Sequence, residues 1–94
     1  MLIVDDKILL ELDTNVVATE DVRGLNCPLP ILRTKKALAK MEGGQLLKVL
    51  TTDKAAVTDL TVFAKQTGHT LKAQSENDGE VAHYIEKRVE SNLK

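Results

Sequence analysis

The two prolines of this 94-residue chain, Pro28 and Pro30, stand one residue apart and constrain the backbone more than any other feature. Proline has no backbone N–H, so a helix accepts it without loss only in the first turn, where that group has no partner. If Cys27 is the cap residue, Pro28 and Pro30 take the first and third helical positions. Asn26 is an alternative cap if the first turn is irregular. The prolines therefore predict a helix that begins directly after Cys27.

A helical repeat follows the prolines. The positions on one side of the predicted helix are mostly apolar: Ile31, Thr34, Leu38 and Met41. The opposite side carries three cations: Arg33, Lys36 and Lys40. Gly24 ends the short strand expected before the helix, and Gly43-Gly44 supplies the left-handed stop after it.

The rest of the chain alternates in the same way between strand and helix patterns. Strands are expected at 18–23, 45–51, 71–76 and 81–87, with a second helix between Asp53 and Gly68 and a tight turn at 77–79. This order, βαβαββ, predicts a two-layer α/β (α+β) sandwich with two helices on one face of a mixed four-stranded sheet. The crossovers favour parallel neighbours and the final hairpin is antiparallel.

Length and composition indicate one domain over residues 1–94, with a core at 18–89. Residues 1–17 form an N-terminal extension that is either a short hairpin or a loose segment. The lone Cys27 has no internal disulfide partner, which favours a reducing compartment. The chain has no apolar run of membrane-spanning length and no basic N-terminal region of a secretion signal. We therefore expect a cytoplasmic protein without membrane contact.

The net charge of −1 hides an uneven distribution, with six acids in residues 1–21 and five bases but no acid in residues 22–41. Direct nucleic-acid binding is not expected, because the chain is neither basic overall nor rich in aromatic residues. The bases are either a solvated face or a docking patch for an acidic protein partner. The candidate docking residues are Arg23, Arg33, Lys36 and Lys40.

Cys27 is the strongest candidate for chemistry. A helix start favours an anion, so a thiol placed there, near lysine and arginine, is expected to have a lowered pKa and to be nucleophilic. Gly24, Asn26 and the two prolines would support the turn that holds the sulfur at the surface. The alternative is that Cys27 is a small buried apolar residue.

Other groups give weaker signals. One cysteine and two isolated histidines fall short of a structural zinc site, so neither a metal nor a cofactor is expected. A Cys–His pair is an alternative if the fold brings His69 or His83 to the thiol. Asp53, or Thr52 before it, is expected to cap the second helix.

The stretch Cys27-Pro28-Leu29-Pro30, preceded by Arg23-Gly24-Leu25, resembles the Cys-Pro-x-Pro motif of the TusA/SirA family of small sulfur carriers. The resemblance covers about residues 18–89. It departs from the family where Lys54 follows Asp53 in place of the usual proline, and in the longer segment before Ala18. Neither departure touches the thiol.

The resemblance implies a βαβαββ sandwich in which Cys27 carries sulfane sulfur as a persulfide. It implies a donor such as a cysteine desulfurase or rhodanese, and an acceptor relay protein of the TusBCD or DsrE type. The sulfur would serve tRNA thiolation, cofactor assembly or sulfur oxidation, and the chain would not be a stand-alone catalyst. Two alternatives remain: a redox-sensing single-thiol regulatory domain, and a non-covalent binding module.

Overall fold

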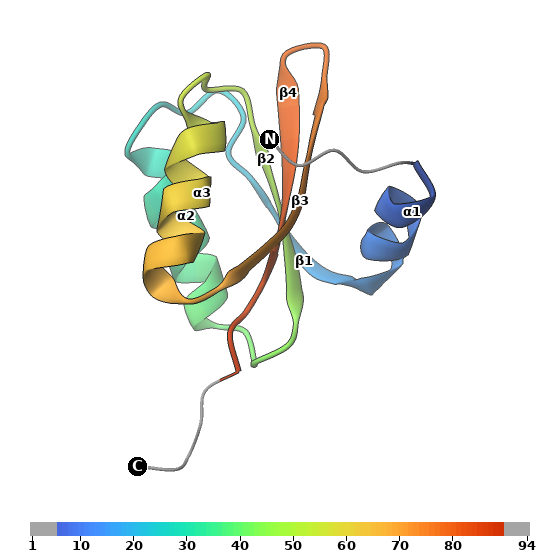
Figure 1. Ribbon diagram of the computed structural model, residues 1–94. Coiled ribbons are helices and arrows are strands. Elements are labelled where there is room, and N and C mark those ends of the chain that lie inside the picture. The colour runs from blue at the N-terminus through green and yellow to red at the C-terminus, as the bar shows by residue number, and fades with distance from the viewer. Residues whose placement is uncertain (1–5, 90–94) are drawn as a thin grey trace.

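The computed structural model describes residues 6–89, which form three helices and one four-stranded sheet (Figure 1). The elements follow one another as α1 (Asp6–Asn15), β1 (Val16–Asp21), α2 (Leu29–Ala39), β2 (Leu46–Thr51), α3 (Ala56–Thr67), β3 (Thr70–Asn77) and β4 (Glu80–Glu86). From β1 onward this is the βαβαββ order expected from the sequence. Gly68 ends α3 in the left-handed conformation, at φ +83°.

The sheet has the order β1-β2-β4-β3 and is mixed. β1 and β2 are parallel, and β4 is antiparallel to both of its neighbours. The expectation of parallel neighbours therefore holds for the first crossover and is wrong for the second, because β4 inserts between β2 and β3. β2 and β3, the strands that this crossover joins, still run in the same direction.

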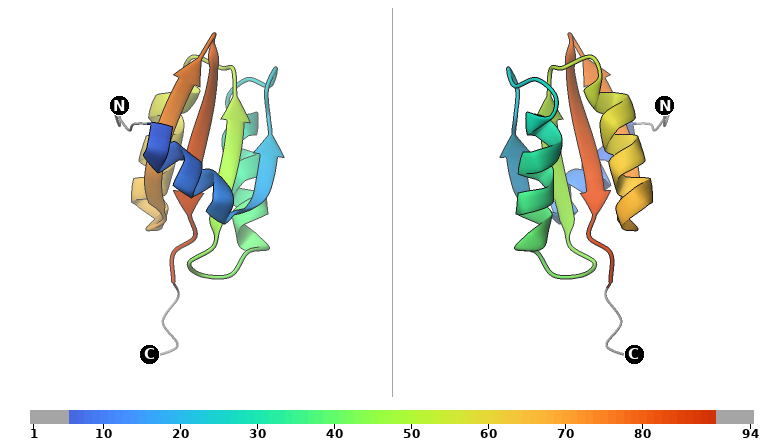
Figure 2. Two further views of the ribbon diagram at one scale, coloured as in Figure 1. Left: turned by 90° about the vertical axis from the view of Figure 1, so that its right-hand side faces the viewer. Right: turned by 90° about the vertical axis from the view of Figure 1, so that its left-hand side faces the viewer.

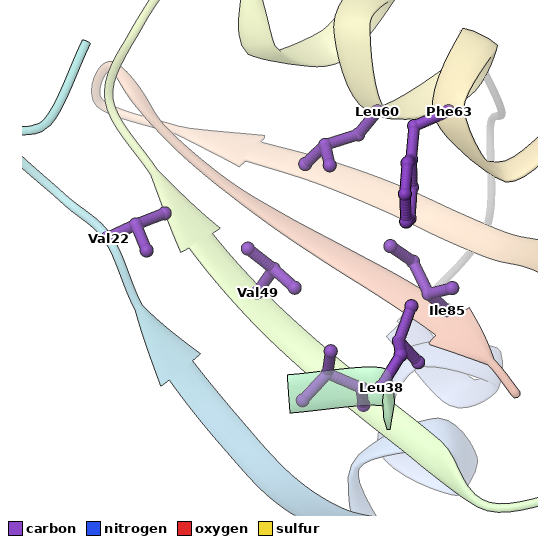
Figure 3. Close-up of a cluster of buried hydrophobic side chains, with 7 residues drawn as sticks. Val22, Leu38, Val49, Leu60, Phe63 and Ile85 are labelled. Atoms are coloured by element: carbon purple, nitrogen blue, oxygen red, sulfur yellow. The ribbon is translucent and has the colours of Figure 1, made fainter. Parts of the chain in front are cut away.

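The helices α2 and α3 together cover one face of the sheet (Figure 1). The main core lies between them and the sheet, and its side chains are drawn in Figure 3. Leu38 of α2 and Leu60 of α3 are buried against Val49 of β2 and Ile85 of β4. Burying each such side chain contributes about 1.5–3 kcal/mol. Phe63 is the only aromatic side chain in this otherwise aliphatic cluster.

The third helix, α1, covers part of the opposite face of the sheet (Figure 2). Leu9 and Leu12 pack against a small cluster that includes the buried Tyr84. The Asp13 carboxylate accepts hydrogen bonds from the Tyr84 hydroxyl at 2.8 Å and from Lys48 Nζ at 3.1 Å. The expectation of a hairpin or a loose segment is thus wrong for the described part of the extension, because this apolar face needs a cover. No helix within residues 6–89 has the length and apolar character to cross a membrane.

Candidate functional site

Cys27 is exposed on the loop that connects β1 to α2. Because β1 and β2 are parallel, their carboxyl ends lie at the same end of the sheet, and the loops that follow them begin there. The β2–α3 loop therefore lies beside the loop that carries the thiol, as Figure 1 shows at the top of the molecule. The alternative of a buried, apolar Cys27 is excluded.

Two backbone N–H groups fix the thiol loop to its neighbour. The Cys27 N–H donates to Asp53 Oδ2 at 2.9 Å, and the Gly24 N–H donates to Thr52 Oγ1 at 2.8 Å. Gly24 has φ +84°, a conformation that residues with a side chain rarely adopt. The loop position of the sulfur is thus held by side chains from the β2–α3 loop.

The helix begins one residue later than the prolines predicted. Pro28 is the cap residue, since its carbonyl accepts the first helical hydrogen bond, from the Leu32 N–H at 3.1 Å. Pro30 is therefore the second helical residue, still within the turn that tolerates proline, and its ring is buried. The Cys27–Pro28 peptide bond is cis. Cys27 thus lies one residue before the cap. The Asn26 carbonyl accepts a hydrogen bond from the Leu29 N–H at 2.9 Å.

The expected lowering of the thiol pKa is wrong. The pKa of Cys27 is raised above its ordinary value, first because the thiol donates a hydrogen bond to the Asp59 carboxylate. Partial desolvation and the negative charges of Asp59 and Asp53 act in the same direction. With its pKa raised, Cys27 is mainly the protonated thiol at neutral pH.

The two arginines that were expected to lower the pKa of the thiol form ion pairs with other acids. Arg23 Nη2 lies 2.7 Å from Asp21 Oδ2, and Arg23 Nη1 lies 3.2 Å from Glu80 Oε1. Hydrogen bonds from the side chain and the backbone N–H of Arg23 lower the pKa of Asp21 to about 2. Arg33 Nη2 lies 2.7 Å from Glu20 Oε2. Closeness in sequence therefore did not pair either arginine with the thiol.

Three of the four candidate docking residues line one groove, and Cys27 is not among its lining residues. Arg33, Lys36 and Lys40 line a groove of about 750 Å³ between α2 and β1. Glu20, Ala37 and Met41 are among the other lining residues. Arg23 does not line this groove; it pairs with Glu80, the first residue of β4.

Within residues 6–89, neither histidine is among the groups that shift the pKa of the Cys27 thiol. His83 is fully buried in β4, where Gln74 Nε2 donates to its Nδ1 at 3.1 Å and its Nε2 lies 2.8 Å from Thr51 Oγ1. His69 Nδ1 accepts the Arg88 N–H at 3.0 Å. A Cys–His pair is therefore wrong for this fold. Residues 6–89 contain no group of three or more side chains suited to a metal.

The sequence-based predictions were incomplete for the two carboxylates near the thiol. Asp53 was expected to cap α3, but the cap residue is Ala55. The Asp53 carboxylate accepts the Ala55 N–H at 3.2 Å, from two residues upstream. Asp59, in the first turn of α3, was not singled out at all. The parallel crossover was the available signal, because it brings the start of α3 next to the thiol loop.

Residues 18–87 match the family model described as sulfurtransferase TusA. The sulfur carrier protein TusA of Allochromatium vinosum is 51% identical over 67 residues, which cover 71% of this chain and 88% of that protein. A Neisseria meningitidis protein, provisionally named a sulfur carrier, is 59% identical over 61 residues, or 65% of this chain and 82% of its own.

A solved structure agrees with the fold. The crystal structure of a SirA-like protein from Desulfitobacterium hafniense superposes with a TM-score of 0.69 and 31% sequence identity. The match covers 77% of this chain and 99% of that one. Helix α1 lies outside the residues that the family model matches.

Proposed function

This chain belongs to the TusA family of sulfurtransferases, and we propose that it is a sulfur carrier which holds one sulfane sulfur as a persulfide on Cys27. The observation that carries the proposal is the exposed thiol on a loop that Asp53 and Thr52 hold by backbone hydrogen bonds. A carrier needs its sulfur atom accessible to two different proteins and fixed in position for both. This loop meets both needs.

Loading is a thiol exchange. The Cys27 thiolate attacks the terminal sulfur of a donor persulfide, a new S–S bond forms to Cys27, and the donor leaves as a thiolate. Cys27 gives up its proton before it attacks, and the Asp59 carboxylate, which raises the pKa of the thiol, opposes this step. A cysteine desulfurase or a rhodanese is the class of donor that presents such a persulfide.

Release runs in the opposite sense. A thiolate on an acceptor attacks the outer sulfur, the S–S bond to Cys27 breaks, and Cys27 leaves and recovers its proton. A leaving thiol with a higher pKa departs more slowly, so the raised pKa of Cys27 favours retention of the sulfur until an acceptor is docked. The acceptor would be a relay protein of the TusBCD or DsrE type, on a route to thiolated tRNA, a cofactor or oxidised sulfur.

The raised pKa of the Cys27 thiol also disfavours the alternative of a redox sensor. Peroxide reacts with thiolate, and the two neighbouring carboxylates keep the resting Cys27 protonated. The chain has no second cysteine to resolve a sulfenic acid. A protonated thiol suits a carrier that must survive in a reducing cytoplasm between partners.

Intact-protein mass spectrometry tests the proposal. The chain is incubated with a cysteine desulfurase and cysteine, or with a rhodanese and thiosulfate, and its mass is measured without reductant. We expect the wild type to gain the mass of one sulfur atom, and to lose it again to dithiothreitol. Cys27→Ser should gain none. Equal gain in Cys27→Ser, or no gain in the wild type with both donors, would refute the proposal.

A further inference from the structure

The groove between α2 and β1 lies beside an open edge of the sheet. β1 is an edge strand, because it pairs with β2 on one side only. Figure 2 shows it at the outer edge of the sheet. The Val22 N–H bonds to the Leu50 carbonyl at 2.9 Å, so by strand alternation the N–H groups of Thr19 and Asp21 point away from β2. The edge therefore presents backbone donors and acceptors next to the groove.

Part of this edge is regular enough to pair with another strand. A register shift interrupts β1 between Val16 and Ala18, a feature that commonly protects sheet edges. From Ala18 to Asp21 the pairing with β2 proceeds residue by residue. This short regular stretch is the part that borders the groove, since Ala18 and Glu20 are among its lining residues.

The groove is positively charged along the helix side. Lys36 and Lys40 are exposed, and neither forms an ion pair with another residue in 6–89. Arg33 is the third cation, and Glu20, its partner at 2.7 Å, is the single acid that lines the groove. Ala37 and Met41 provide an apolar surface among these charges. Three cations against one carboxylate favour an acidic occupant.

The spacing of the lysines fits a strand. Residues four apart on a helix are separated by about 6 Å along its axis. Alternate residues of a strand lie about 7 Å apart and face the same side. A strand placed along β1 would therefore bring side chains at alternate positions opposite Lys36 and Lys40. Glutamates at those positions would meet the ammonium groups while their methylenes cover Met41.

We propose that this groove binds an extended acidic segment of a partner protein, which adds as a fifth strand to the edge of β1 with carboxylates at alternate positions facing Lys36 and Lys40. Backbone hydrogen bonds to the edge would supply affinity, and the two lysines would select the acidic sequence. The thiol takes no part, so this docking surface stands apart from the sulfur chemistry proposed above.

A designed peptide tests the inference: end-capped, with glutamate and threonine at alternating positions and a fluorescent label. Its binding to the full chain is measured by anisotropy at low and at physiological salt. We expect saturable binding that weakens with salt. N-methylation of the alternate residues that face β1 should weaken binding at least tenfold, since it removes the strand hydrogen bonds and keeps every charge.

Variants of the chain complete the test. Lys36→Gln with Lys40→Gln should weaken binding at least tenfold, whereas the matched pair Lys65→Gln with Lys72→Gln, on α3 and β3, should leave it unchanged. Cys27→Ala should bind as the wild type does, so the result does not depend on sulfur transfer. Hydrogen exchange should show new protection at Thr19 and Asp21.

Three outcomes would overturn the inference. The first is equal binding of the N-methylated peptide, and the second is equal loss of binding in the two lysine pairs. The third is self-association of the wild type, measured by analytical ultracentrifugation, that the Lys36→Gln and Lys40→Gln variant abolishes. That result would assign the groove to a second copy of the chain.

Discussion

The backbone N–H of Cys27 donates to Oδ2 of Asp53 at 2.9 Å, and this hydrogen bond ties the thiol loop to the β2–α3 loop. The other carboxylate oxygen, Oδ1, accepts the Ala55 N–H at 3.2 Å. One side chain therefore organises two segments that are distant in sequence.

Asp53→Ala removes both of these hydrogen bonds. We expect the free energy of unfolding to fall by about 1–2 kcal/mol, since a net hydrogen bond contributes about 1 kcal/mol. Sulfur loading of Cys27 should also slow, because the loop loses its tether. Urea denaturation and the loading assay measure the two effects. Asp53→Asn keeps one of the two acceptor oxygens, so it should lose about half as much stability as Asp53→Ala. Equal losses in both variants would contradict a hydrogen-bonding role.

Asp59→Asn should lower the pKa of the Cys27 thiol. The carboxylate raises that pKa by accepting the S–H and by its charge, so a neutral amide removes both effects. The pH profile of alkylation by iodoacetamide reports the pKa, and the variant should react faster than the wild type at neutral pH. Glu42→Gln, beyond the far end of α2, is the control. A profile that is unchanged in Asp59→Asn would show that the carboxylate does not govern the thiol.

Thr34 is fully buried, and within the described chain its hydroxyl has no hydrogen-bond partner. Thr34→Val replaces the hydroxyl with a methyl group of similar size, so the free energy of unfolding should rise, by up to about 1–2 kcal/mol. Thr51→Val is the matched comparison, because Thr51 Oγ1 is bonded to His83 and its loss should destabilise the fold. Thermal denaturation of the two variants should shift in opposite directions; a shared direction would contradict the assignment.

His83 should make the fold less stable in mild acid. Burial lowers its pKa to about 4, against an unfolded value of about 6.5. Between these values the unfolded chain binds more protons than the native one, so stability falls as the pH falls from about 6.5 toward 4. The loss between pH 7 and pH 5 should be about 2 kcal/mol.

Chemical denaturation at several pH values checks this expectation. His83→Gln has no imidazole to titrate, so the same pH interval should cost it less than the wild type by that amount, whatever its stability at pH 7. Other groups titrate alike in both proteins and cancel in the difference. Parallel pH profiles for the two proteins would mean that His83 is not the responsible group.

Much of the fold was predictable because its signals are local. The prolines set the start of α2 to within one residue, and Gly68 marked the end of α3. The turn at 77–79 identified the final hairpin. Each of these residues acts through its own backbone conformation, which does not depend on the rest of the structure. The order of the strands was not predictable in the same way, since sequence pattern does not say that β4 lies between β2 and β3.

The sequence by itself determined that the only thiol stands on a turn before a proline-started helix, and that a βαβαββ chain surrounds it. Only the tertiary structure decided the chemical state of that thiol and the position of α1. The reason is that both depend on groups brought together through space. Asp59 acts on Cys27 from α3, and Asp13 of α1 accepts a hydrogen bond from Tyr84 of β4. The arginines closest to Cys27 in sequence instead pair with other acids.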